Sequence, residues 1–484
     1  MNERNLTLLT DFYEITMANG YFAKGKKEQT AVFDMFFRRA PDGGGYAVMA
    51  GVGPLIDYLE NLRFTDADIA FLRNKGFFQA DFLEFLRTFR FECDVWAIPE
   101  GTPIFPGEPL VVVKGPILQG QFVETMILLT VNHQSLIATK ANRMYQAAKG
   151  RGILEFGSRR AQGYDGAVLG ARAAYIGGCS GTACTMADLR YGIPAAGTMA
   201  HSWVQSFDSE YEAFKAYAQI YPDQALFLVD TYNVVRSGIP NAIRVFNEVV
   251  LPMGFRPKGI RLDSGDLAYL SKQARTMLDE AGFEDARIVA SNALDEYIIR
   301  DLMLQGAAVD TFGVGERLIT ACSDPIFGGV YKLVAMEKDG RLVPKIKISE
   351  DPEKIINPHF KQVYRLYSKG SHRAIGDVIT LFDEGIDESR PYELFHPDFT
   401  WKRKTVRDFE AKPLLTPVFA GGKRVYESPG VHEIRDFCRR QVDQTLWDEV
   451  KRFENPHRYY VDLSQKLWDI KQNLLREETR KYEV

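Results

Sequence analysis

Between residues 150 and 320 the chain repeats one unit, a short apolar run followed by a stretch with the apolar periodicity of a helix. The clearest apolar runs cover residues 153–156, 225–229, 259–262, 287–290 and 309–313. Strands that alternate with helices in this way pair in parallel, because each helix carries the chain back across the sheet. Weaker runs near Tyr175 and Ala195 bring the number of units to about seven. The pattern predicts an irregular α/β barrel, short of the usual eight strands.

Polar residues follow these runs where each predicted strand ends. They are residues 157–160 after the first run, Asp230 and Thr231 after the second, residues 263–266 after the third, and Ser291 and Asn292 after the fourth. Parallel sheets and barrels carry their chemistry at the carboxyl ends of their strands. We therefore expect an active site at this edge.

The chain on either side of this region has a different pattern. Residues 30–116 contain short β-rich runs separated by Gly and Pro clusters, with a helical stretch at 66–90. One long helix is predicted from Gln121 to Lys149. After Tyr331 strand-like runs return, and a charged helix follows Ser464. The predicted domains are an α/β sandwich at 1–135, completed by a C-terminal appendage at about 330–484, and the α/β barrel at 136–329.

The charge balance argues against several classes of function. Sixty Lys and Arg against 64 Asp and Glu give a formal net charge of -4, so no basic excess points to nucleic acid or an anionic membrane. The longest apolar stretch, residues 123–138, carries Asn132, His133 and Gln134 in its middle, where a bilayer would leave them unpaired. Five sparse cysteines and a charged amino terminus without a secretory signal favour a reducing compartment, and we expect the cytoplasm.

Two glycine-containing segments could bind a phosphorylated ligand, although the standard P-loop and dinucleotide-binding motifs are absent. Gly313 and Gly315 would expose backbone N–H groups to a phosphate, or would form only a tight turn. Arg261 and Asp263 share one face of a strand, and the carboxylates of this segment suit ribose hydroxyls or a hydrated Mg²⁺. The alternative is an Asp-Ser-Gly turn that caps the helix beginning near Leu267.

Two further segments carry chemically suitable side chains. Phe156 can stack on a flat ring, and Arg159 offers a planar fork to a carboxylate or phosphate. The alternative is a core phenylalanine beside surface arginines. His201 follows a run of small residues, and although a lone histidine is more often structural, this one lies at the expected functional edge.

Several strings, taken together, resemble those of the nicotinate phosphoribosyltransferase family. They are Thr10 to Glu14, Glu155 to Arg160, Gly197 to Trp203, Asp230 to Tyr232 and Arg261 to Asp266, in the family's order over essentially the whole chain. The resemblance implies a type II phosphoribosyltransferase fold, an irregular seven-stranded α/β barrel beside an α/β sandwich domain. It also implies a homodimer whose active sites are shared between the subunits.

The activity that the resemblance implies is the first step of NAD salvage from nicotinate. A 5-phosphoribosyl group passes from phosphoribosyl pyrophosphate to nicotinate and gives nicotinate mononucleotide and pyrophosphate. As in an ATP-coupled ligase, ATP is the co-substrate and is hydrolysed to ADP and phosphate through a phosphohistidine. Mg²⁺ is the implied cofactor.

The resemblance also implies a role for each matching residue. Phe156 and Tyr13, the latter from the other subunit, would sandwich the pyridine ring, with Arg159 close to its substituent. His201 would be the phosphorylated histidine and would be catalytic with Arg261 and Asp263. Asp230 would support the ribose or hold Mg²⁺ together with Asp263. Further substrate contacts are implied for Thr198, Ser264, Ser291, Asn292, Gly313 and Gly315.

The implied reaction requires residues of these types. The pyridine nitrogen already has a lone pair, so no strong general base is needed, and the barrier lies in charge build-up at the anomeric carbon as pyrophosphate leaves. Cationic side chains and Mg²⁺ can neutralise the leaving group while a fixed site aligns nucleophile and sugar.

One departure bears on the choice of substrate. The nicotinamide-using relative carries an aspartate directly after a Gly-Thr pair, whereas Gly181-Thr182 is followed here by Ala183. An aspartate would repel a carboxylate, so its absence favours nicotinate. The alternatives are a nicotinamide phosphoribosyltransferase, a quinolinate-type enzyme that decarboxylates during transfer, and a catalytically silent sensor of phosphoribosyl pyrophosphate or a nucleotide.

Overall fold

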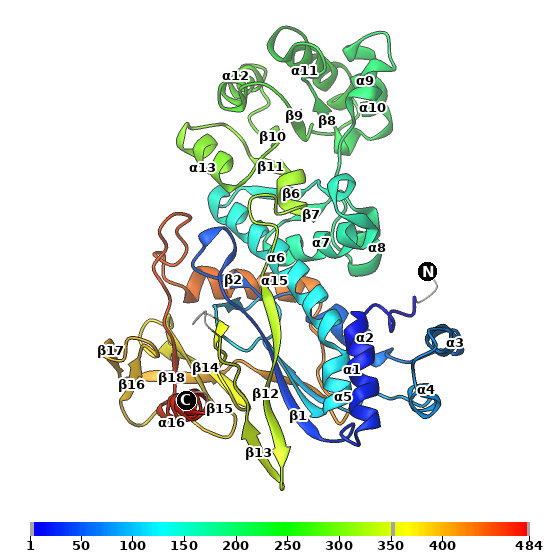
Figure 1. Cartoon of the computed structure of the whole chain (residues 1–484). Coiled ribbons are helices and arrows are strands. Elements are labelled where there is room, and N and C mark those ends of the chain that lie inside the picture. The colour runs from blue at the N-terminus through cyan, green and yellow to red at the C-terminus, as the bar shows by residue number, and fades with distance from the viewer. Residues whose placement is uncertain (1–3, 350–353, 482–484) are drawn as a thin grey trace. The chain divides into compact units, whose positions relative to one another are not determined.

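The computed structural model describes residues 4–349 and 354–481 and confirms the predicted mixed α/β class. The chain forms two compact units (Figure 1). Unit 1 comprises Met1–Leu136 and Ile326–Val484, and unit 2 comprises Ile137–Pro325. The boundary falls within the long helix α6, Glu124–Ala148. The predicted helix from Gln121 is interrupted at Val123, where the backbone (φ -90°, ψ 0°) leaves helical geometry after α5, Ile117–Phe122.

Unit 2 is built on a parallel sheet of six strands in the order β7, β6, β11, β10, β9, β8. The strands are β6 Gly152–Glu155, β7 Gly181–Thr182, β8 Leu226–Leu228, β9 Gly259–Leu262, β10 Arg287–Ser291 and β11 Thr311–Val314. Five of them coincide with the five clearest apolar runs. Phe227, Ile260 and Phe312 are fully buried, as expected for strands covered on both faces.

Two of the seven predicted strands differ in the structure. Tyr175 lies in helix α7, Gly163–Gly177, because the alanine-rich run around it favours a helix. Ala195 forms only a single bridge to Thr182, since Pro194 lacks an N–H and the small residues after it bury little side chain. In the described residues the ladders therefore form an open series of six strands and not a closed ring of seven.

Helices connect the strands of unit 2. They are α7, α8 Thr185–Tyr191, α9 His201–Gln205, α10 Glu210–Ile220, α11 Ile239–Val245, α12 Leu267–Glu280, α13 Glu296–Leu304 and α14 Glu316–Ile319. Helix α12 contacts β9 and β10 in the green part of the chain (Figure 1). Its first turn is capped by the Asp266 carboxylate, which accepts a hydrogen bond from the Tyr269 N–H at 3.0 Å. The predicted helix-capping turn is thus present, and Asp263 remains outside it.

Unit 1 contains two larger sheets. The first has the order β13, β12, β1, β5, β3, β19, β20, with β13 Arg341–Pro344, β12 Gly329–Lys338, β1 Thr30–Phe37, β5 Val111–Pro116, β3 Asp94–Ala97, β19 Thr416–Ala420 and β20 Lys423–Arg424. The second has the order β18, β14, β15, β21, with β18 Phe409–Pro413, β14 Lys361–Ser368, β15 Ala374–Leu381 and β21 Val461–Leu463. The C-terminal part thus contributes strands to the first sheet, β12 beside β1 and β19 beside β3.

The remaining elements of unit 1 are short strands and helices. Two antiparallel pairs are formed by β2 Ala47–Val48 with β4 Pro103–Ile104 and by β16 Tyr392–Phe395 with β17 Arg403–Val406. The helices are α1 Phe12–Ala23, α2 Val52–Glu60, α3 Asp66–Asn74, α4 Ala80–Arg87, α5, α15 Val431–Arg440 and α16 Gln465–Arg480. Within the described residues, no helix is long and apolar enough to cross a membrane.

Candidate active site

The carboxyl ends of the parallel strands in unit 2 lie in register and bring their polar residues to one edge. Ser291 of β10 pairs with Gly313 of β11, and Glu155 of β6 pairs with Val314. On the other side of β10, Leu262 of β9 pairs with Ala290. Residues that follow these positions therefore emerge side by side. The edge predicted from the sequence is the one at which the candidate residues gather.

Arg261 is the centre of the hydrogen-bond network at this edge. Its guanidinium donates to the Ser291 hydroxyl at 2.9 Å, to the Thr198 hydroxyl at 3.2 Å and to the Asp263 carboxylate at 3.0 Å. Only 14% of the Arg261 side chain is exposed. The bond to Thr198 ties the segment that leads to His201 onto β9. The side chain of Arg261 thus joins three other predicted residues.

Phe156 lies beside this arginine, directly after β6. The Arg261 guanidinium carbon is 5.4 Å from the centre of its ring, within the range of a cation–π contact. The ring also lies against Gly313, where an added Cβ would come within 2.7 Å of ring carbons. Glycine at 313 therefore makes room for the ring. Phe156 is half-buried and not a fully enclosed core residue, so part of its surface is free to contact a ligand.

Glu155 at the end of β6 supports the turn that carries Phe156. It was not among the individual site residues predicted from the sequence. Its carboxylate accepts hydrogen bonds from the Gly157 N–H and from the Thr182 hydroxyl, the latter at 2.6 Å. Burial raises the pKa of Glu155 above its ordinary value, while these two bonds oppose the shift. The available signal was an acidic residue inside an otherwise apolar strand. Glu155 fixes the backbone that carries Phe156 and the following arginines.

His201 faces two carboxylates. Its Nδ1 lies 3.1 Å from the Thr231 hydroxyl, and its Nε2 lies 4.0 Å from Asp230 Oδ1 and 3.9 Å from Asp263 Oδ2. The histidine begins α9 and is not at a strand end as expected, yet 40% of its side chain remains exposed. The ring is therefore accessible and held between a hydroxyl and two acids.

The two aspartates fit the predicted Mg²⁺ site. Asp230 Oδ2 accepts hydrogen bonds from the Asp263 N–H at 3.0 Å and the Ser264 hydroxyl at 2.6 Å. Asp230 Oδ1 is buried and has no hydrogen-bond partner among the described residues. Asp263 Oδ1 accepts bonds from Arg261 and Ser291, which leaves its Oδ2 toward His201. One carboxylate oxygen of each residue thus remains available for a cation.

The protein would supply few ligands to such a cation. Among residues 4–349 and 354–481, no group of three or more His, Cys, Asp or Glu side chains is placed to hold a metal ion. Mg²⁺ is commonly held by one or two carboxylates, with water and substrate phosphates completing the octahedron. The two aspartate carboxylates match that pattern.

Four other predicted residues lie around this centre. Asn292 follows β10 with a positive φ of 98° and is exposed. Gly315 follows β11, where an added Cβ would lie 3.2 Å from the Phe156 carbonyl oxygen. Arg159 is exposed in the short helical turn Ser158–Arg160. Ser264, also exposed, is held by Asp230.

Tyr13 is the one predicted site residue in unit 1. It lies in α1, and 45% of it is exposed. Burial and the nearby carboxylates of Glu124 and Glu14 raise the pKa of Tyr13 above its ordinary value. Beside it, Glu14 is fully buried and accepts a hydrogen bond from the Thr125 hydroxyl at 2.8 Å. Burial raises the pKa of Glu14 to about 7.

The family is decided by the match of most of the chain to three sequence models. The model of the nicotinate phosphoribosyltransferase N-terminal domain matches residues 8–132, that of the nicotinate phosphoribosyltransferase family matches residues 152–370, and that of its C-terminal domain matches residues 360–471. The chain belongs to the nicotinate phosphoribosyltransferase family. The resemblance seen in the short strings is confirmed.

Individual members of the nicotinate phosphoribosyltransferase family match nearly end to end. The nicotinate phosphoribosyltransferase of Bacillus subtilis is 46% identical over 473 residues, which cover 98% of this chain and 96% of the relative. That of Mycobacterium tuberculosis is 41% identical over 95% of this chain and 92% of its own length. The crystal structure of the human enzyme superposes with a TM-score of 0.84 at 31% identity, covering 97% of this chain and all of the human chain.

Proposed function

We propose that this protein transfers the 5-phosphoribosyl group of phosphoribosyl pyrophosphate to nicotinate, the first step of NAD salvage from nicotinate. The observation that carries the proposal is the cluster around Arg261, which joins an aromatic ring, two hydroxyls and a carboxylate at one strand edge. It occurs in a chain 46% identical to a nicotinate phosphoribosyltransferase over nearly its whole length. Phe156 would thus contact the pyridine ring, and the neighbouring Arg261 would contact the charged sugar phosphate.

The pyridine ring would stack on Phe156, with Arg159 close to the nicotinate carboxylate. The ring nitrogen attacks the anomeric carbon of the ribose, and the C–O bond to pyrophosphate breaks. Because the nitrogen lone pair is already free, the protein need only orient the two reactants and stabilise the charge that separates. No side chain has to remove a proton from nicotinate.

Arg261 and the two aspartates would act on the ribose and the leaving group. The bonds to Ser291 and Asp263 hold the planar guanidinium of Arg261 in one position. Asp230 and Asp263 would hold Mg²⁺, which neutralises pyrophosphate charge when bound. Preorganised charges of this kind stabilise a transition state without reorganising during the reaction.

ATP would be coupled to transfer through His201. A ring nitrogen attacks the γ-phosphorus of ATP, the bond from that phosphorus to the ADP oxygen breaks, and hydrolysis later releases phosphate. The exposed side chain and its position beside Asp230 and Asp263, the proposed cation ligands, support this role. A phosphohistidine would add a charge of roughly -2 beside Asp230 and Asp263 and so favour the cation-bound state.

The proposed transfer is tested by incubating the purified protein with Mg²⁺, phosphoribosyl pyrophosphate and either nicotinate or nicotinamide. Chromatography of the products should show nicotinate mononucleotide in the first reaction. Product from nicotinamide alone would favour the nicotinamide enzyme. Ligand-dependent stabilisation without product from either pyridine would favour the sensor.

Replacing Gly313 with alanine should raise the KM for nicotinate about fivefold. The new Cβ would clash with the Phe156 ring at 2.7 Å and displace it, and a lost aromatic contact is worth about 1 kcal/mol. Steady-state kinetics with nicotinate as the varied substrate measures the effect. Gly166→Ala in α7 is the control, because its Cβ would meet only Ala161 at 4.0 Å. An unchanged KM for Gly313→Ala would remove Phe156 from the ring site.

Replacing Ala183 with aspartate should lower kcat/KM for nicotinate by at least about tenfold. Ala183 is exposed directly after β7, and its N–H donates to the Glu155 carbonyl oxygen at 2.8 Å, next to the Phe156 turn. A carboxylate there would repel nicotinate and could accept the amide N–H of nicotinamide. The ratio of kcat/KM for the two pyridines measures the change. Ala183→Asn is the neutral control, and an equal loss in both variants would contradict repulsion.

A homodimer with shared sites predicts recovery of activity in mixed dimers. Tyr13→Ala and Phe156→Ala should each strongly reduce activity, and mixing the two subunits should restore about a quarter of the wild-type rate. In a random mixture half of the dimers are mixed, and each contains one site with both wild-type rings. Activity of unfolded, remixed and refolded subunits gives the measurement. No recovery in a mixture shown to contain mixed dimers would place both rings in one subunit.

A further inference from the structure

Unit 1 contains a pocket of about 420 Å³ beside the β16–β17 hairpin. We call it the hairpin pocket, and its lining residues are Leu394, His396, Trp401, Lys402, Arg403, Lys404, Tyr460 and Asp462. All of these residues belong to unit 1, whereas Phe156, Arg261 and His201 belong to unit 2. Ligand pockets usually measure about 300–1,000 Å³. The hairpin pocket therefore has room for a small molecule and is not made of the catalytic residues.

Two lysines give the hairpin pocket its positive charge. Lys402 directly precedes β17 and Lys404 lies within it, and both line the pocket. Among the described residues neither ammonium has a carboxylate within 4 Å, and both rest over aromatic rings. Lys402 Nζ is 5.2 Å from the centre of the Trp401 ring, and Lys404 Nζ is 5.3 Å from that of Tyr460. Their charges are available to an anion.

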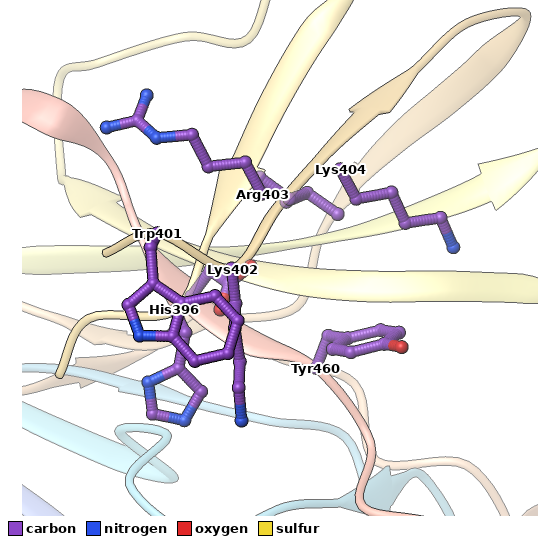
Figure 2. A pocket seen from close by; sticks show the side chains of 8 residues that line it. His396, Trp401, Lys402, Arg403, Lys404 and Tyr460 are labelled. Carbon is purple, nitrogen blue, oxygen red and sulfur yellow. The ribbon is translucent and has the colours of Figure 1, made fainter. Parts of the chain in front are cut away.

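Arg403, between the two lysines, is differently placed. Its guanidinium pairs with Glu393 of β16 at 2.6 Å and donates to the Thr400 carbonyl oxygen at 3.0 Å. Figure 2 shows this side chain extending away from Lys402, Trp401 and His396. All three cations line the pocket, but the Arg403 guanidinium is neutralised by Glu393 across the hairpin.

Aromatic rings supply the second feature of the pocket. Trp401 is 76% exposed and Tyr460 is 38% exposed. Figure 2 shows Trp401 beside His396 and Lys402, and Tyr460 below Lys404. An exposed indole next to a free ammonium offers a flat ligand a stacking surface and its anion a cation. Rings and charges are therefore combined on both sides of the pocket.

A buried carboxyl group supplies the third feature. Asp462 in β21 is only 4% exposed and accepts no hydrogen bond from a residue in the described part of the chain. Burial raises the pKa of Asp462 to about 7, while the positive charge of Arg458 opposes the shift. A buried carboxyl that accepts no hydrogen bond is unfavourable, and a hydroxyl or amino group of a ligand would donate one to it. A ligand that carries both an anionic group and a hydrogen-bond donor would therefore complement the two lysines and Asp462.

His396 helps to fix the shape of the pocket. Its Nδ1 accepts hydrogen bonds from the backbone N–H groups of Asp398 and Phe399, each at 3.1 Å, and we therefore assign the ring proton to Nε2. Burial and the charges of Arg458 and Lys402 lower the pKa of His396. The neutral ring holds the turn that presents Trp401 and offers one further N–H donor.

We propose that the hairpin pocket binds a purine ribonucleoside monophosphate. The base would stack on Trp401, the phosphate would lie between Lys402 and Lys404, and Asp462 would accept a hydrogen bond from a ligand hydroxyl or amino group. Two unpaired ammonium groups match one phosphate monoester, whose charge is about -1.5 to -2 at neutral pH. A purine offers a two-ring face comparable to that of indole. The protein's net charge of -4 argues against a long nucleic acid as the occupant.

The first experiment titrates the full-length protein with adenosine monophosphate and follows tryptophan fluorescence and the heat of binding. Stacking on Trp401 should quench fluorescence. Trp401→Phe should remove the quenching but keep the heat, because phenylalanine still offers a ring, whereas Trp401→Ala should weaken binding at least tenfold. Quenching that persists in Trp401→Phe, together with unchanged affinity in Trp401→Ala, would place the nucleotide elsewhere and overturn the proposal.

The second experiment separates specific contacts from overall charge. The double variant Lys402→Ala, Lys404→Ala should weaken adenosine monophosphate binding at least tenfold, and adenosine or inorganic phosphate alone should bind at least tenfold more weakly to the wild-type protein. Arg403→Ala changes the charge on the same strand but should alter the affinity less than twofold. Equal weakening by Arg403→Ala, equal affinity for inorganic phosphate, or tighter binding of oligoadenylate would each contradict a mononucleotide site.

Discussion

Replacing Arg261 with alanine should lower kcat/KM for phosphoribosyl pyrophosphate by about a thousandfold or more. The side chain donates to Ser291, Thr198 and Asp263. Its removal leaves the partly buried Asp263 carboxylate without a cation and the hydroxyls of Ser291 and Thr198 without their donor. Hydrogen bonds to charged groups are worth about 1.5–3 kcal/mol each, and about 4 kcal/mol corresponds to a thousandfold in rate. Steady-state kinetics with both substrates varied provides the measurement.

A matched control for this variant lies on the neighbouring strand. Arg287 begins β10, is exposed, and lies at the opposite, amino-terminal edge of the same sheet. Arg287→Ala should leave kcat/KM within about twofold of wild type, since exposed polar residues contribute little. Arg261→Lys should recover part of the rate, because it restores the charge without the planar fork. Equal rates for Arg261→Ala and Arg287→Ala would contradict the role of Arg261.

Replacing His201 with alanine should abolish ATP hydrolysis and the stimulation of transfer by ATP. Slow ATP-independent transfer should remain, because Phe156, Arg261 and the aspartates are left in place. The prediction follows from the exposed imidazole between the Thr231 hydroxyl and two carboxylates. ADP release and nicotinate mononucleotide formation, measured in one reaction, give both quantities.

Labelling with γ-labelled ATP identifies the phosphorylated residue directly. Wild-type protein should acquire an acid-labile label, and His201→Ala should not. His372, exposed in unit 1, provides the control as His372→Asn, which should be labelled normally. Thr231→Ala should be labelled more slowly, because the ring loses the hydroxyl beside Nδ1. Undiminished label in His201→Ala would assign the phosphoryl group to another residue.

The sequence was most informative where local pattern and final environment coincide. β6, β9, β10 and β11 are short, largely buried parallel strands, and such strands appear as mainly apolar runs. The polar residues that directly follow these strands could be placed together, because the carboxyl ends of the strands in a parallel sheet meet at one edge. Arg261 and Asp263 could be placed on one face by strand alternation alone, and the structure pairs them at 3.0 Å.

The features that the sequence did not predict depend on tertiary contacts. The run at Tyr175 is the exception, because the helix propensity of its alanines was a local signal for α7 that its apolar character masked. Glu155 has an ordinary acidic side chain whose role depends on the Thr182 hydroxyl, 27 residues away. Gly313 is required by the position of the Phe156 ring, which no local pattern contains. Lys402 and Lys404 likewise stand out as anion-binding candidates only because the structure pairs the neighbouring Arg403 with Glu393.

The most direct test of the central claim is the rate of nicotinate mononucleotide formation with and without ATP at fixed nicotinate, phosphoribosyl pyrophosphate and Mg²⁺. ADP is measured in the same reactions. The account predicts faster product formation with ATP and ADP release that accompanies it. A rate that ATP does not change, with no ADP released, would contradict ATP coupling through the site around His201 and Arg261.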